Sequence, residues 1–185
     1  NLNGDMEILQ TSLKDCFLIQ PRIFRDSRGF FLESFQLERY RSLVGINDLL
    51  IQDNFSRSSF GTLRGLHFQK NNPQGKLAMV SMGSVLDVVV DLRSESETFS
   101  KWEFFELNDQ NFNQLWIPPG FAHGFLVLSE YAHFHYKCTA YYDPEDEGII
   151  KWDDPTLNIT WPDDIEFNIS EKDKNAPSFE QFIAG

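Results

Sequence analysis

Short apolar segments separated by turn-forming residues make up most of this chain. Residues 76–92 carry the clearest strand pattern, and Gly83 divides them into two strands. Side chains on a strand alternate between its two faces, so residues 85–92 have a period of two. This period puts Leu86, Val88, Val90 and Leu92 on one face, and Val85, Asp87, Val89 and Asp91 on the other.

Two further segments also indicate strands. Residues 133–140 alternate cleanly, and Tyr136 lies on their less polar face. Residues 16–19 form a short apolar run that Pro21 closes, which predicts an edge strand. Many short strands with frequent turn signals predict an all-β protein, either a β-sandwich or a small barrel.

The pattern predicts only a few short helices. Ser34 can cap a helix that runs to about Val44, and Gly45 fits the C-terminal stop of that helix. Near the other end of the chain, Ser170 followed by Asp173 at the third helical position has the form of a helix N-terminus.

The length of the chain, 185 residues, favours a single domain, which we assign to residues 1–185. Residues 163–185 are expected to form a C-terminal extension with short helical segments. Residues 1–5 precede Met6, and we interpret them as a possible remnant of expression cloning.

The net charge of −12 argues against a nucleic-acid-binding surface, which would be basic. A negative net charge still allows an anionic small molecule to bind, because a few cationic side chains that converge in a pocket set the local potential. The two cysteines, Cys16 and Cys138, provide neither a disulfide framework nor a zinc spacing. No apolar run reaches transmembrane length, and the N-terminus is too polar for a signal peptide. We therefore expect a cytoplasmic protein without nucleic-acid or membrane partners.

Candidate chemistry gathers around residues 61–76, which carry Arg64, His67 and Lys76. Histidine is the side chain whose ordinary pKa lies near neutrality, so His67 is the first candidate for a proton-transferring base. A structural histidine with satisfied hydrogen bonds explains it equally well. Strict alternation puts Arg64 and His67 on opposite faces, so both can reach one site only if Gly65 marks a bulge or a tight twist.

Four ionisable or polar residues are embedded in predicted strands: His67, Lys76, His123 and Tyr136. A metal site is one interpretation, but the spacing is poor, and the pair at residues 133 and 135 lies on the face opposite Tyr136. Metal-free proton transfer is the other. It needs a histidine base, a lysine that stabilises an enolate oxygen, and a tyrosine acid.

Ordered motifs run from about residue 17 to about residue 180. They include Asp-x-Arg-Gly-x-Phe-x-Glu at residues 26–33, Arg-Gly-Leu-His-x-Gln at residues 64–69, and Trp-Ile-Pro-x-Gly-Phe-Ala-His-Gly-Phe at residues 116–125. On these residues the chain resembles the dTDP-4-dehydrorhamnose 3,5-epimerases, which are nucleotide-sugar epimerases. The resemblance implies an all-β, cupin-like jelly-roll fold with a few short helices.

The resemblance also implies a reaction and a set of catalytic residues. The reaction inverts C3 and C5 of dTDP-4-dehydro-6-deoxy-D-glucose and gives dTDP-4-dehydro-L-rhamnose, a step in dTDP-L-rhamnose biosynthesis. His67 would be the base, Tyr136 the acid, and Lys76 would help to hold the enolate. Asp173 is the preferred carboxylate for orienting His67, and Asp87 is a rival.

The nucleotide-sugar contacts that the resemblance implies are Arg28, Glu33, Gln52, Asp53, Asn54, Arg64, His123, Tyr142, Glu147 and Lys172. It further implies no metal and no cofactor. Members of the family are homodimers in which the segment around residues 28–33 reaches the site of the neighbouring subunit.

Three alternatives stay open at this point. Related enzymes invert only C3 or only C5 of a nucleotide 4-keto-6-deoxysugar and keep most of these motifs. A non-catalytic, cupin-like sugar-binding module would need Arg64 but not His67, Lys76 and Tyr136 together. A metal-dependent cupin enzyme, such as an isomerase, would need a bound ion.

Overall fold

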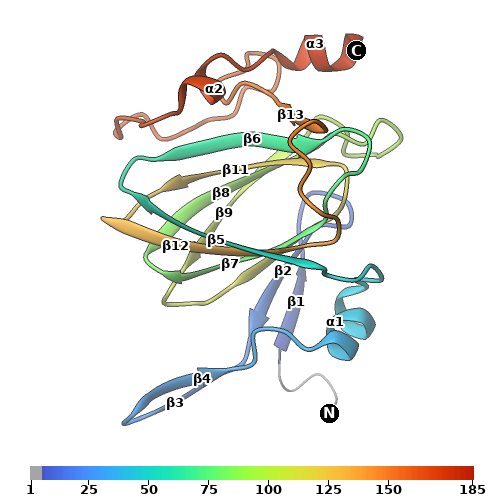
Figure 1. The fold of residues 1–185 in the computed structure, drawn as a ribbon. Helices are drawn as coiled ribbons and strands as arrows, with labels where there is room; N and C mark the ends of the chain where they lie inside the picture. Colours follow the sequence, from blue (N-terminus) through green and yellow to red (C-terminus); the bar gives the residue numbers. More distant parts are fainter. Residues whose placement is uncertain (1–5) are drawn as a thin grey trace.

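Two facing antiparallel β-sheets form the body of the protein (Figure 1). The computed structural model describes residues 6–185, so the interpretation of residues 1–5 falls outside it. One sheet has the strand order β1-β2-β10-β7-β12-β5, and the other has the order β13-β6-β11-β8-β9. Within this part of the chain the sheets do not close into a barrel, so the β-sandwich is the predicted architecture that the structure confirms.

The strands of the six-stranded sheet are β1 (Met6–Gln10), β2 (Phe17–Pro21), β5 (Gln52–Ser59), β7 (Lys76–Met82), β10 (Gln114–Ile117) and β12 (Tyr131–Cys138). Those of the five-stranded sheet are β6 (Leu63–Gln69), β8 (Ser84–Asp91), β9 (Trp102–Asn108), β11 (Phe121–Val127) and β13 (Glu147–Ile149). The break predicted at Gly83 separates β7 from β8.

Apolar side chains from both sheets form the core between them. Val85 and Val89 on β8 pack there with Phe125 and Phe134, as the predicted alternation of residues 85–92 requires. The opposite face of β8 is also buried. There Val88 and its neighbours pack against the C-terminal part of the chain through Ile150, Leu157, Ile159 and Phe179.

The C-terminal segment covers the outer face of the five-stranded sheet, at the top of Figure 1. It contains α2 (Glu171–Lys174) and α3 (Phe179–Ala184), which confirms the short helical segments predicted after residue 163. Ser170 caps α2 as predicted, because its side chain accepts a hydrogen bond from the Asp173 amide. The cap holds Asp173 in α2, where its carboxylate is within hydrogen-bond distance of Gly65 on β6.

Two local predictions are wrong. Helix α1 (Leu37–Val44) begins after Gln36, whose side chain accepts from the Arg39 amide, so Ser34 is not its cap. Gly45 does end the helix, with φ of 84°. The strand closed by Pro21 is not an edge strand, because β2 pairs with β1 on one side and β10 on the other.

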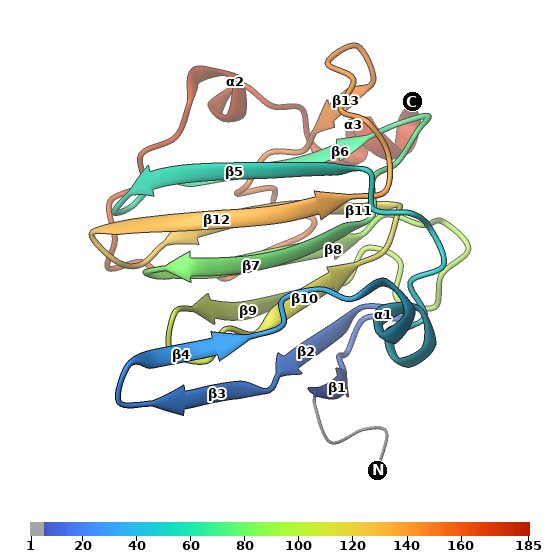
Figure 2. The same cartoon turned by 60° about the horizontal axis from the view of Figure 1, so that its bottom comes forward.

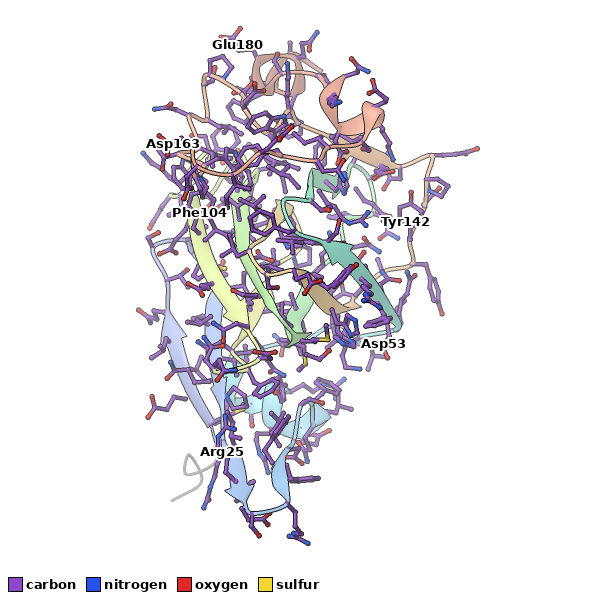
Figure 3. The ribbon with its side chains drawn as sticks, turned by 90° about the vertical axis from the view of Figure 1, so that its left-hand side faces the viewer. Arg25, Asp53, Phe104, Tyr142, Asp163 and Glu180 are labelled. Carbon is purple, nitrogen blue, oxygen red and sulfur yellow. The ribbon has the colours of Figure 1, made fainter. Side chains whose placement is uncertain are left out.

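A separate hairpin, β3 (Ile23–Asp26) and β4 (Gly29–Leu32), lies outside the six-stranded sheet (Figure 2). Its tip projects away from the sandwich, and the ring of Phe31 is largely exposed. In Figure 3, Arg25 of this hairpin and Tyr142 lie at well-separated parts of the molecule.

Candidate active site

A shift in register between β6 and β11 brings Arg64 and His67 to the same cavity. His123 pairs with His67, but Phe125 pairs with Arg64. The three-residue interval from Arg64 to His67 on β6 therefore lies opposite a two-residue interval on β11. Gly65 lies at this irregularity, and a Cβ there would be 2.7 Å from the Gly124 Cα, which excludes a side chain. The bulge that the sequence required at Gly65 is therefore present.

His67 contacts Asp173, the carboxylate that the sequence analysis preferred over Asp87. The Nε2 of His67 lies 2.8 Å from Asp173 Oδ1, and Asp173 Oδ2 accepts a hydrogen bond from the Gly65 amide at 3.0 Å. Burial works against ionisation of Asp173, but these hydrogen bonds outweigh it and lower its pKa. The histidine ring itself is one-third exposed, so it can meet a ligand.

The rival carboxylate, Asp87, contacts the other cavity histidine instead. Its Oδ2 lies 2.7 Å from His123 Nε2, and both side chains are buried. Burial raises the pKa of Asp87, and the interaction with His123 offsets this only in part. Each cavity histidine therefore pairs with an aspartate: His67 with Asp173 of α2, and His123 with Asp87 of β8.

The six-stranded sheet supplies Lys76 and Tyr136 to the same cavity. The Lys76 Nζ lies 5.4 Å from the centroid of the Tyr136 ring, and only 8% of Lys76 is exposed. Burial lowers the pKa of Lys76 against the pull of neighbouring negative groups. Burial raises the pKa of the Tyr136 phenol, and the Asn54 side chain opposes this. Tyr136 thus retains its proton at neutral pH.

The cavity between the sheets has a volume of about 290 Å³. Of the predicted site residues it is lined by Asn54, Arg64, His67, Lys76, His123, Tyr136, Tyr142 and Glu147. Groups from opposite sheets face the same space. A ligand held there would have a histidine on one side and a tyrosine on the other.

At the rim of the cavity, the predicted residue Lys172 joins two of these lining residues, Tyr142 and Glu147. Glu147 Oε2 accepts hydrogen bonds from Lys172 Nζ at 2.6 Å and from the Tyr142 hydroxyl at 2.9 Å. Burial opposes ionisation of Glu147, but these two bonds outweigh it and lower its pKa. Gln52 also lies at the rim. Its side chain accepts a hydrogen bond from the Tyr142 amide and donates one to the Asn54 side chain.

The structure keeps three predicted residues apart from the cavity. Asp53 lies on the opposite face of β5, where it pairs with Lys137 and lines a different cavity of about 350 Å³. Arg28 is at the exposed tip of the β3–β4 hairpin and pairs with Asp26. Glu33 pairs with Arg39 and lines a separate cavity with Phe24 and Phe31 of that hairpin.

Gln69 also lines the cavity, although the sequence analysis included it in a motif without assigning it a role. Its side chain donates to the carbonyls of Asn72 and Tyr141 and accepts from the Asp143 amide, so it holds the loop that carries Tyr142. A signal was available, because Gln69 follows His67 by two residues on one strand and therefore shares its face.

Other site types find little support in residues 6–185. No three of their His, Cys, Asp or Glu side chains are placed to hold a metal ion. Cys16 and Cys138 are both free and buried. The described helices are all too short or too polar to cross a membrane.

Comparison with known proteins identifies relatives along nearly the whole chain. The family model described as dTDP-4-dehydrorhamnose 3,5-epimerase matches residues 10–181. The dTDP-4-dehydrorhamnose 3,5-epimerase of Salmonella typhimurium is 46% identical over 179 residues, which cover 96% of this chain and 98% of that protein.

Solved structures give the same answer and add a variant of the reaction. A dTDP-6-deoxy-D-glucose-3,5-epimerase from Legionella pneumophila, solved with dTDP-4-keto-L-rhamnose, is 51% identical. It has a TM-score of 0.91 and covers 94% of this chain and 92% of its own. A 3′-monoepimerase from Streptomyces bikiniensis, solved with dTDP-quinovose, is 34% identical with a TM-score of 0.85. That match covers 91% of this chain and 85% of the monoepimerase.

Proposed function

Because the chain belongs to the dTDP-4-dehydrorhamnose 3,5-epimerase family, we propose that it inverts C3 and C5 of dTDP-4-dehydro-6-deoxy-D-glucose. The product is dTDP-4-dehydro-L-rhamnose, an intermediate of dTDP-L-rhamnose biosynthesis. The observation that carries the proposal is the cavity itself, in which His67 from one sheet and Tyr136 from the other face the same space. Inversion at carbon requires proton transfer on opposite faces, and this cavity offers one group for each.

Each catalytic role follows from the chemistry of its side chain. The 4-keto group acidifies the protons at C3 and C5. His67, held by Asp173, removes one of them, and Tyr136 returns a proton from the opposite face. Lys76 stabilises the negative oxygen of the enolate by its fixed charge. The cycle then repeats at the other carbon.

Cationic side chains at the mouth support binding of the nucleotide diphosphate. Arg64 and Lys172 both border a cavity of about 540 Å³ that adjoins His67. Arginine and lysine bind phosphate oxygens through charge-assisted hydrogen bonds. This local positive region allows an anionic substrate to bind a protein of net charge −12.

We further propose that the protein is a homodimer in which each hairpin serves the neighbouring site. The Arg28 side chain is 88% exposed and does not line the cavity of its own chain, and the β3–β4 hairpin projects away from the sandwich (Figure 1). Mixing Arg28→Ala with His67→Asn tests this, because in a mixed dimer one site combines both intact residues. Restored activity in the mixture supports a hairpin that serves the neighbouring site. Native mass spectrometry shows whether mixed dimers form. If they form and the mixture stays inactive, the proposal is contradicted. The cytoplasmic location stays a prediction of the sequence.

The reaction is tested by incubating the protein with dTDP-4-dehydro-6-deoxy-D-glucose in deuterated water and following C3 and C5 by NMR. Deuterium at both carbons supports the 3,5-epimerase. Label at one carbon indicates a mono-epimerase, which the likeness to the 3′-monoepimerase makes the second candidate. No label at either carbon, with the ligand bound, would favour a sugar-binding module.

Two variants separate the proton-transfer roles in the same assay. His67→Asn is expected to stop label entry at both carbons. Tyr136→Phe is expected to allow exchange with retention, because His67 still removes and returns the proton on its own face. Inversion at the wild-type rate in Tyr136→Phe would remove Tyr136 from the mechanism.

A further inference from the structure

The β3–β4 hairpin stands apart from the two sheets of the sandwich (Figure 2). Within residues 6–185 its two strands pair only with each other. Phe24, Phe30 and Phe31 on the hairpin are 47, 52 and 69% exposed. A hairpin of two strands is marginally stable on its own in water. The direction of this hairpin therefore depends on the contacts that join it to the rest of the chain.

A buried polar network holds the segment that leaves the hairpin. Ser34 follows β4 by two residues, and its carbonyl oxygen accepts a hydrogen bond from Gln114 Nε2 at 2.6 Å. The Tyr40 hydroxyl lies 3.0 Å from the same carbonyl oxygen and 2.6 Å from Gln114 Oε1, so it can donate its proton to either. Tyr40 and Gln114 are each only 1% exposed. We call these three residues the Ser34 clamp.

The Ser34 clamp connects the hairpin to elements that are fixed in the sandwich. Gln114 lies on β10, which pairs with β2 on one side and β7 on the other. Tyr40 lies on α1, and its ring belongs to a buried cluster with Ile19 and Trp116 of the same sheet. A buried polar network in which each group has a partner makes the structure around it rigid. The clamp can therefore fix the angle at which the chain leaves the hairpin.

The other contacts of the hairpin lie nearer the solvent. Arg25 donates to a backbone carbonyl of the loop between β9 and β10 at 3.1 Å, in an exposed position. Phe30 packs beside Phe112 with half of its own surface exposed. Glu33 pairs with Arg39, and both side chains are partly exposed. Exposed polar contacts contribute little to a structure. The Ser34 clamp is thus the attachment best suited to set the direction of the hairpin.

We propose that Gln114 and Tyr40 are positioning residues for the hairpin of a homodimer. Through the Ser34 carbonyl they hold the hairpin in the direction that lets Arg28 serve the site of the neighbouring subunit. The proposal rests on the proposed function, and in particular on the hairpin exchange described there. It gives a role in the reaction to two buried residues that do not line the catalytic cavity of their own chain.

Gln114→Met tests the clamp because it keeps the length of the side chain but removes its hydrogen bonds. The homodimer of this variant should lose about tenfold in kcat/KM, since misplaced binding groups reduce turnover. A mixed dimer with His67→Asn, isolated with two affinity tags, should not show this loss. Its one site with an intact His67 is served by the intact hairpin of the His67→Asn chain. The value of kcat/KM should equal that of a mixed dimer of wild type and His67→Asn.

The mixed dimers separate a positioning role from a structural one. A residue that merely supports the active site of its own chain is not repaired by a partner chain. A mixed dimer of Gln114→Met and His67→Asn that keeps the defect would therefore overturn the proposal. Wild-type kcat/KM in the Gln114→Met homodimer would also overturn it. In a mixed dimer of Gln114→Met and Arg28→Ala neither hairpin is intact, so activity should stay low.

Two tyrosine variants complete the test. Tyr40→Phe keeps the buried ring and removes only the hydroxyl, so it replaces Gln114→Met if that variant does not fold. It should show a smaller defect with the same repair by His67→Asn, and a defect without repair would overturn the proposal. Tyr131→Phe, on β12, is the matched control, because Tyr131 is partly exposed and lies outside the Ser34 clamp. It should keep the wild-type kcat/KM.

Failure of the clamp can be distinguished from failure of the function on which it rests. The mixture of Arg28→Ala and His67→Asn reports the exchange by itself. If that pair is repaired and the pair of Gln114→Met and His67→Asn is not, the clamp alone is wrong. If neither pair is repaired, the exchange is wrong and the clamp with it. Failure of the epimerase assignment would appear separately, as absence of label in the deuterium assay.

Discussion

The two histidine–aspartate pairs have the same chemistry but opposite surroundings. His67 and His123 are cross-strand neighbours on β6 and β11, and each binds a carboxylate through Nε2. Asp173 receives a second hydrogen bond, from the Gly65 amide, and its pKa is lowered. Asp87 is wholly buried with one oxygen unbonded, and its pKa is raised.

This difference separates a group that exchanges protons from one that holds a fixed charge. In the outer pair, His67 and Asp173, the histidine ring is one-third exposed and can meet the ligand. Its carboxylate is stabilised as an anion. Such a histidine can gain a proton and return it. In the inner pair, His123 and Asp87, both side chains are buried, so any change of charge is penalised and the pair suits a constant role in holding the His123 ring.

The largest effect should come from removing the outer histidine. His67→Asn is expected to lower kcat by about 10³-fold or more, because it removes the general base. Steady-state kinetics and deuterium exchange measure this loss. His135→Asn, on the outer face of β12 and bonded to Ser81, is a control for loss of a histidine and should change kcat by less than about twofold. Near-normal turnover of His67→Asn would show that His67 is not the general base. The proposed functional difference between the two histidine–aspartate pairs would then be lost.

Removing the outer carboxylate should cost less than removing the base. Asp173→Asn leaves His67 in place but replaces the anion that fixes its tautomer and orientation. A fall in kcat of roughly 10²-fold is expected. A KM increase with unchanged kcat would show instead that Asp173 serves substrate binding.

The inner histidine should have a smaller effect than either member of the outer pair. His123→Asn removes the single substrate contact that we propose for His123 and leaves Asp87 in place. A loss of about tenfold in kcat/KM is expected, since one hydrogen bond contributes about 1 kcal/mol. A loss as large as that of His67→Asn would contradict the division between the two pairs.

Periodicity predicted the parts of this site that depend on one strand alone. The period of two put Asp87 on one face with Val85 and Val89, and that face is the inner one. It also put Tyr136 on the less polar face of its strand, which packs against the core. These predictions hold because a regular strand fixes the direction of each side chain.

The pairing of the two carboxylates could not be obtained in this way. Asp173 lies 106 residues beyond His67, and it reaches that ring only because the C-terminal segment folds back over the sheet. Which histidine meets Asp87 depends on the register between β6, β8 and β11. The sequence required an irregularity at Gly65 but did not specify its size.

The smallest expected effect is on stability, and it should have opposite signs of pH dependence for the two carboxylates. The lowered pKa of Asp173 means that its contribution to folding is complete above its unfolded pKa of about 4 and is lost as pH falls through the folded pKa. Asp173→Asn should therefore cost about 1–3 kcal/mol at pH 5 and progressively less towards pH 2.

The pKa of Asp87 is raised, so its carboxyl group binds a proton more tightly in the folded protein than in the unfolded chain. The contribution of Asp87 to stability is therefore complete below its unfolded pKa of about 4 and is lost as pH rises through the raised folded pKa. Urea unfolding of wild type, Asp173→Asn and Asp87→Asn between about pH 2 and pH 5 measures both slopes. Differences from wild type that change with pH in the same direction would mean that the two carboxylates have equivalent environments, and the comparison between the two pairs would fail.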